Sequence, residues 1–105
     1  MTDVKVSVTF RHTQPTDALK RYAEEKLHKI GKYFNRPLEA HVVLSVDARA
    51  RQLAEVTVQS RGMTFHGREE TDDLYAAIDL LMDKVEQQIR KYKTKTQLKR
   101  RRVKS

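Results

Sequence analysis

The chain of 105 residues contains no cysteine. This absence excludes a disulfide framework, a thiolate nucleophile and any zinc site built from cysteine ligands. No apolar run approaches the roughly 18 residues that a membrane span needs, and the polar start MTDVKVS does not have the form of a secretory signal peptide. We therefore expect one soluble, cytoplasmic domain, able to bury about 65% of its unfolded surface without cross-links.

Residue patterns typical of catalysis are also scarce. The three glycines form no phosphate-binding loop, and the four histidines lack metal-ligand spacing. We expect His41 and His66 to share the solvent-facing side of a sheet, with a strand between them. Asp79 and Asp83 are spaced for a metal or an acid/base pair, but they share a helix flank with Arg90, which favours a solvated, ion-paired face. We expect no enzyme, no metal and no cofactor.

The positive charge is concentrated at one end of the chain. Residues 1–92 contain 15 Lys/Arg and 14 Asp/Glu, whereas residues 93–105 contain seven Lys/Arg and no acid, which together make the net charge of +8. A balanced body followed by a basic segment favours binding to nucleic acid or an anionic surface. The alternative is a tail that serves only solubility. We expect a folded domain over residues 1–95 and a basic, flexible tail over 96–105.

Hydrophobic periodicity predicts six elements in the order β-α-β-β-β-α. Alternating apolar residues predict strands at about 4–10, 40–46, 54–59 and 63–68. Helical spacing predicts one helix from the N-cap Thr16 to about residue 34 and another from the N-cap Thr71 to about residue 95. Each strand has one apolar face, so we expect an α+β fold in which both helices cover one side of a four-stranded sheet. The first two strands should be parallel, with a right-handed crossover.

The predicted helix within TDDLYAAIDLLMDKVEQQIRKYKTK, residues 71–95, has three faces at about 100° per residue. Its apolar stripe comprises Leu74, Ile78, Leu81, Val85, Ile89 and Tyr92. One flank carries Lys84, Gln88, Lys91 and Lys95, and the opposite flank carries Asp79, Asp83 and Glu86. Sorting the two signs onto opposite flanks favours a polyanion partner on the cationic side. The alternative, that lysines complement the helix dipole, explains the two C-terminal lysines but not Lys84.

The first helix carries Tyr22, Lys26, Lys29 and Tyr33 along one edge of its apolar stripe. Aromatic rings between lysines can stack on bases while the ammonium groups meet phosphates. The alternative is that both tyrosines lie at the margin of the core. With both helices on one side of the sheet, we expect the two rows to face each other across a shared groove.

The phrase DDLYAAIDLLMDKVEQQIRKYK resembles the ribosome hibernation-promoting factor family, also known as ribosome-associated inhibitors. The positions that match its second helix are Asp73, Leu74, Tyr75, Ala77, Ile78, Asp79, Leu81, Asp83, Lys84, Val85, Gln88 and Ile89. The first helix matches at Thr16, Ala18, Leu19, Tyr22, Lys26, Leu27, Lys29, Tyr33 and Phe34. The resemblance covers about residues 4–95; it departs at Gln87, where many relatives have arginine, and in the basic rather than acidic tail.

This resemblance implies a double-stranded-RNA-binding-like fold and binding to the small ribosomal subunit, in the mRNA/tRNA channel at the decoding region. It implies inhibition of translation in dormant ribosomes, during stress or stationary phase. The rRNA contacts that it implies are Lys26, Lys29, Lys84, Lys91 and Lys95, to which the helix patterns add Tyr22, Tyr33 and Gln88. A general binder of structured RNA or tRNA is the alternative. The sequence leaves open whether ribosome dimers are promoted or prevented. We expect no ribosome-dimerising domain of the larger relatives in a chain of this length.

Overall fold

The computed structural model describes residues 4–32, 37–60 and 62–104, with side chains described as far as Tyr92. Its elements are β1 (Val4–Arg11), α1 (Asp17–Gly31), β2 (Leu38–Val46), β3 (Gln52–Ser60), β4 (Met63–Thr71) and α2 (Leu74–Lys104). The predicted order β-α-β-β-β-α is confirmed.

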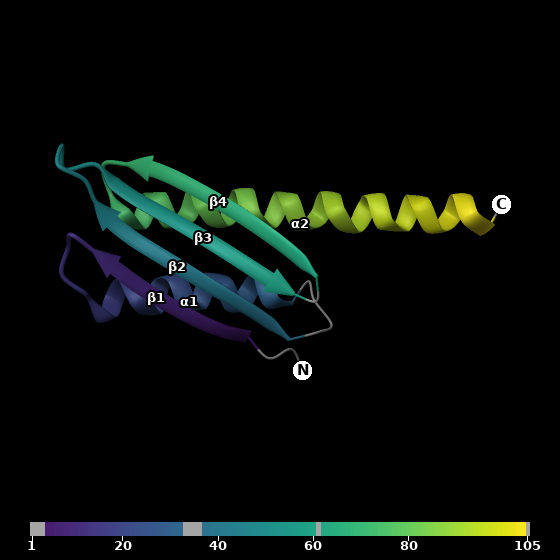
Figure 1. Cartoon of the computed structure of the whole chain (residues 1–105), viewed down its shortest axis with the longest axis horizontal. Coiled ribbons are helices and arrows are strands. Elements are labelled where there is room, and N and C mark those ends of the chain that lie inside the picture. The colour runs from purple at the N-terminus through teal and green to yellow at the C-terminus, as the bar shows by residue number, and fades with distance from the viewer. Residues whose placement is uncertain (1–3, 33–36, 61, 105) are drawn as a thin grey trace.

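The four strands form one sheet in the order β1-β2-β3-β4. β1 and β2 are parallel, whereas the β2–β3 and β3–β4 pairs are antiparallel. Both helices lie on the same face of this sheet, α1 behind β1 and β2 and α2 behind β3 and β4 (Figure 1). The predicted α+β architecture is therefore confirmed, and the other face of the sheet carries no element of the described chain.

The core lies between the helices and the covered face of the sheet. Side chains that the alternation pointed inward are buried there, including Val42, Leu44, Val56 and Val58, and the helices contribute buried residues that include Leu27, Ile78, Leu81, Val85 and Ile89. Burial of these side chains is the main stabilising contribution to the fold, at about 1.5–3 kcal/mol for each large aliphatic residue.

Two helix starts were predicted, and the structure confirms one of them. Thr16 caps α1, because its hydroxyl oxygen accepts a hydrogen bond of 3.2 Å from the amide of Leu19. The prediction of Thr71 as the cap of α2 is wrong, because β4 continues to Thr71 and α2 begins at Leu74. Asp73 is the cap instead: its carboxylate accepts a hydrogen bond of 3.3 Å from the amide of Tyr75.

α2 is longer than its apolar stripe. The last buried residue among its described side chains is Ile89, whereas Tyr92 is 44% exposed and packs edge-on against Phe65 of β4, with ring centroids 6.1 Å apart. Tyr92, predicted as the last residue of the apolar stripe, therefore contacts the sheet at the partly exposed end of that stripe. The helix continues to Lys104 and projects well beyond the sheet (Figure 1). The flexible character expected of residues 96–105 stays a prediction.

α2 approaches β4 closely at Gly67. A Cβ atom at this position would lie 2.6 Å from Cδ1 of Leu81 and 3.3 Å from Cγ2 of Val85. Only glycine allows the helix to come this near without displacing those side chains, so Gly67 sets the distance between α2 and the edge strand.

Candidate nucleic-acid interface

The cationic flank of α2 lies along the edge strand β4. Lys84 forms an ion pair with Glu69, a residue of β4 in the same phase of the strand alternation as Phe65 and Gly67. One turn further on, Gln88 donates a hydrogen bond of 2.9 Å from its side-chain nitrogen to the backbone carbonyl of His66. Two neighbouring members of the predicted row are thus engaged with β4.

Lys91 continues this flank and is exposed to solvent. Among the residues that the structure describes, no carboxylate forms an ion pair with it. By helix rise, Lys84 and Lys91 are separated by about 10 Å along the axis. The flank therefore presents one lysine held by a carboxylate and one whose charge is available to a ligand.

The row on α1 faces the acidic flank of α2. The ammonium of Lys26 lies 3.2 Å from a carboxylate oxygen of Asp79 and 5.4 Å from the ring centroid of Tyr22. The hydroxyl of Tyr22 donates a hydrogen bond to the same carboxylate. Asp79 therefore joins two residues of α1 that sequence analysis assigned to RNA.

These contacts shift the ionisation of all three groups. The hydrogen bond from Tyr22, and secondarily the contact with Lys26, hold the pKa of Asp79 below its ordinary value of 3.8. The hydrogen bond to Asp79 is also the main reason that the pKa of Lys26 is raised above 10.5 and the pKa of Tyr22 above 10.0. At neutral pH the cluster consists of an ionised carboxylate, a charged ammonium and a neutral phenol.

The expectation that the two cationic rows face each other across one groove is wrong. The apolar stripe of α2 packs on β3 and β4, which turns its cationic flank toward the β4 edge and its acidic flank toward α1. A groove between the helices is lined by Lys26, Lys29, Ile30, Lys32, Met82, Asp83 and Glu86. Counting Asp79, which pairs with Lys26, the groove holds three lysines and three carboxylates, so it has little net charge as a whole.

Lys29 lies on the α1 side of this groove and is exposed. No ion pair joins it to a carboxylate in the described part of the chain. Tyr33 falls within residues 33–36, outside the described residues, and the side chain of Lys95 also lies outside them.

Glu69 and Tyr75 were not among the site residues predicted from the sequence, but the structure brings both to these flanks. Glu69 continues the alternation of Phe65 and Gly67 by two residues, but the predicted strand ended at residue 68. Tyr75 lies four residues before Asp79, and its ring packs edge-on against Tyr22, with centroids 5.1 Å apart and planes at 71°. Extending the period-two and period-four patterns would have found both.

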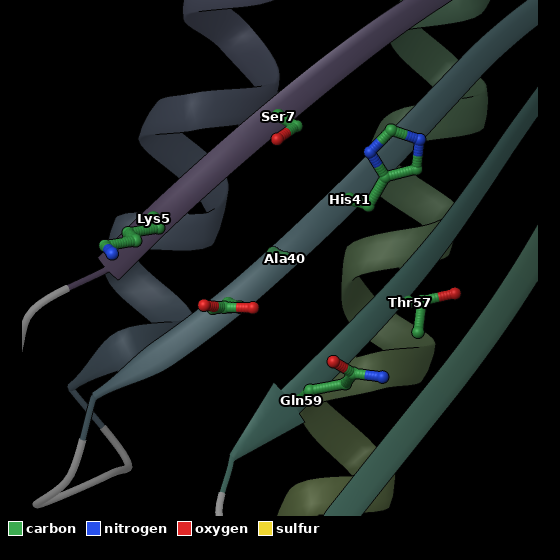
Figure 2. A pocket seen from close by; sticks show the side chains of 7 residues that line it. Lys5, Ser7, Ala40, His41, Thr57 and Gln59 are labelled. Carbon is green, nitrogen blue, oxygen red and sulfur yellow. The ribbon is translucent and has the colours of Figure 1, made fainter.

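The open face of the sheet is polar and of mixed charge. A shallow hollow on it is lined by Lys5, Ser7, Glu39, Ala40, His41, Thr57 and Gln59 (Figure 2). His41 and His66 both pair in register with Thr57, so β3 separates them as predicted. Within residues 4–32, 37–60 and 62–104, no three His, Asp or Glu side chains gather as a metal site would require.

Comparison with known proteins places this geometry in a family. A sequence profile described as "Sigma 54 modulation protein / S30EA ribosomal protein" matches residues 6–97, from within β1 to within α2. The chain belongs to this family. The matched residues include the cationic flank of α2, its partners on β4 and the Tyr22–Lys26–Asp79 cluster, so the candidate interface lies within the S30EA region.

Two curated S30EA relatives are named ribosome hibernation promotion factor. The chain is 36% identical to the one from Lactococcus lactis subsp. cremoris (strain MG1363) over 100 residues, covering 93% of this chain and 54% of the relative. It is 42% identical to the one from Staphylococcus aureus (strain COL) over 88 residues, covering 82% of this chain and 46% of the relative. The chain thus spans about half the length of these relatives.

Solved structures confirm the S30EA fold. The crystal structure of the Thermus thermophilus Protein Y N-terminal domain matches with a TM-score of 0.77 and 34% identity, covering 86% of this chain and 98% of that one. A ribosomal subunit interface protein from Coxiella burnetii matches with a TM-score of 0.74 and 28% identity, covering 90% and 99%. In addition, none of the helices described here has the length and apolar character to span a membrane.

Proposed function

We propose that this chain is a ribosome hibernation factor. It binds the small ribosomal subunit in the mRNA/tRNA channel at the decoding region and inhibits translation in the cytoplasm during stress or stationary phase. The observation that carries the proposal is the segregation of charge on α2, whose cationic flank lies at the β4 edge while its acidic flank is engaged with α1. The printed names of the relatives from L. lactis and S. aureus support the same function.

The mechanism is steric and needs no bond-making chemistry. A folded domain held in the channel excludes mRNA and tRNA, and lysine–phosphate contacts anchor it there. The proposed contacts remain Tyr22, Lys26, Lys29, Tyr33, Lys84, Gln88, Lys91 and Lys95. Among those with described side chains, Lys29 and Lys91 should contribute most per residue, because no ion pair with a described carboxylate offsets their charge.

Binding should depend steeply on salt. Each neutralised phosphate releases counterions, so with about five to seven contacts the logarithm of the affinity should fall by about 4–6 for a tenfold rise in salt. Co-sedimentation with purified small subunits at several salt concentrations measures this slope. Equal retention from low to high salt would overturn the electrostatic anchor.

The residue test uses Lys29→Gln and Lys91→Gln together. The double variant should reduce the steepness of the salt dependence by about 1.8, or 0.9 per lost contact, and should unfold at the wild-type temperature because both side chains are exposed. The matched control is Lys20→Gln, an exposed lysine of α1 nine positions before Lys29 and so about half a turn around the helix. If the double variant binds like the control, Lys29 and Lys91 do not contact the RNA.

A general binder of structured RNA would behave differently in competition. A hibernation factor should stay on small subunits in the presence of excess duplex RNA or free tRNA. Equal partitioning among these RNAs would support the general binder and contradict the proposed function.

A further inference from the structure

The two side chains of the ion pair between Lys84 and Glu69 differ strongly in their exposure to solvent. The Lys84 side chain is 60% exposed, whereas the Glu69 side chain is only 14% exposed. The carboxylate oxygen that meets the ammonium, Oε1 of Glu69, is fully buried. The acid therefore lies under α2 on the covered face of β4, and the lysine reaches over it with part of its surface toward solvent.

The packing around this pair leaves little room for rearrangement. At Gly67, two residues before Glu69, α2 approaches β4 so closely that a Cβ atom would collide with Leu81. At the residue before Gly67, the hydrogen bond from Gln88 to the carbonyl of His66 ties the next turn of α2 to the same strand. β4 is thus fixed against α2 at two adjacent residues just before Glu69.

Burial makes the pair costly to break from the lysine side. If Lys84 swung out to follow a ligand, Glu69 would be left as a buried carboxylate without its counter-charge. A lysine side chain is otherwise a flexible point charge with large rotamer freedom. Glu69 therefore converts Lys84 from a mobile cation into one fixed in position, and it also offsets the attraction of that cation for distant anions.

We infer that Glu69 is a specificity-determining residue, which pins Lys84 so that only a phosphate located at the ammonium's solvent-facing side gains from it. Lys91, on the same flank, attracts any polyanion, whereas Lys84 stabilises only a complex in which a phosphate lies at its fixed position. The inference rests on the proposed function for the identity of the specific partner, the small-subunit RNA. The pinning itself applies to any RNA.

The decisive variant is Glu69→Gln, which keeps the shape of the side chain and removes its charge. Its matched control is Glu55→Gln, which removes one charge from the open face of the sheet, where Glu55 pairs with Arg68 at 3.7 Å and both side chains are at least half exposed. Affinity is measured for a short RNA duplex of mixed sequence and for purified small subunits, each at several salt concentrations.

Releasing Lys84 should strengthen binding to the duplex by about threefold to tenfold relative to the control, and steepen its salt dependence by up to about 0.9. Affinity for small subunits should rise by less, so the ratio of the two affinities should fall. If both variants show the same duplex affinity and the same ratio, Glu69 does not determine specificity.

Thermal unfolding provides a second test that does not depend on RNA. Lys84→Gln should lower the melting temperature by about 5 °C or more, because it leaves the buried carboxylate of Glu69 without a counter-charge. Adding Glu69→Gln to this variant should restore most of the lost stability. Lys91→Gln is the control and should leave the melting temperature unchanged. An equal effect of the Lys84 and Lys91 variants would show that Glu69 does not pin Lys84. Absence of wild-type binding to small subunits would instead overturn the proposed function and leave this test intact.

Discussion

At the scale of single residues, lysines that look equivalent in the sequence have different electrostatic surroundings. Lys26 meets Asp79 and Lys84 meets Glu69, whereas Lys29 and Lys91 form no ion pair with a described carboxylate. An internal carboxylate lowers the net charge that a phosphate meets, but it also orients the ammonium. The paired lysines are therefore suited to positioning, and the unpaired ones to general attraction.

The Asp79 cluster makes a pH-dependent contribution to stability. Because the pKa of Asp79 is lowered in the folded state, its contribution is present above the ordinary value of 3.8 and is lost as pH falls through the lowered pKa. Because the pKa values of Tyr22 and Lys26 are raised, their contribution is present below about pH 10 and is lost as pH rises through the raised values.

Asp79→Asn tests this cluster. Since Lys26 and Asp79 are both partly exposed, the variant should lose only about 1 kcal/mol of unfolding free energy at neutral pH. The difference from wild type should be constant between about pH 5 and 9 and should shrink outside that window, as measured by urea unfolding at each pH. Asp83→Asn, on the same flank, is the control. A difference that does not change with pH would contradict the assignment of these contacts.

At the scale of elements, α2 combines a packed half with a projecting half. The half up to Ile89 contributes to the core, and the remainder extends past the sheet (Figure 1). Residues 93–104 contain seven Lys/Arg and no acid. Like charges at neighbouring positions of a helix repel one another and weaken it. A polyanion would remove that repulsion, so this end of α2 is suited to binding RNA.

Deleting residues 96–105 should distinguish the contribution of the end of α2 to RNA binding from the contribution of its packed part to stability. The deletion removes five Lys/Arg, so it should reduce the steepness of salt-dependent binding by at most about 4.5. The melting temperature should stay the same, because the deleted residues lie beyond Ile89, the last residue of α2 with a described, buried side chain. A full-length variant with glutamine at those five positions distinguishes charge from length. A large fall in melting temperature on deletion would mean that the segment packs on the domain.

At the scale of the whole molecule, the sheet acts as a platform that holds two helices on one side. The longest dimension is 55 Å against 27 and 19 Å for the other two, and α2 accounts for most of it, at about 46 Å by helix rise. Such an elongated body, cationic along one flank and at one end, fits a channel lined by phosphates better than a compact pocket.

The proposed binding in the mRNA/tRNA channel predicts mutual exclusion. Small subunits loaded with mRNA and initiator tRNA should retain much less of the protein than empty subunits, and the protein should inhibit translation in a purified system. The Lys29→Gln, Lys91→Gln double variant should inhibit less, whereas Lys20→Gln should act like wild type. Equal binding to loaded and empty subunits would place the protein elsewhere on the ribosome.

The sequence by itself determined the elements and their order. Strand alternation and helical spacing are properties of neighbouring residues, so Val42 and Val56 could be assigned to the core, and the three faces of α2 could be separated, before any contact was known. Boundaries were less certain where a cap competes with a strand, as at Thr71, because Asp73 also has a side chain that can cap a helix.

Only the tertiary structure decided what each flank meets. The apolar stripe determines how α2 rotates on the sheet, but the neighbour on each side depends on strand order and on the placement of α1. These long-range relations put Asp79 beside Lys26 and Glu69 beneath Lys84. Periodicity describes the direction of a side chain from its own helix and contains no information about the partner that it finds there.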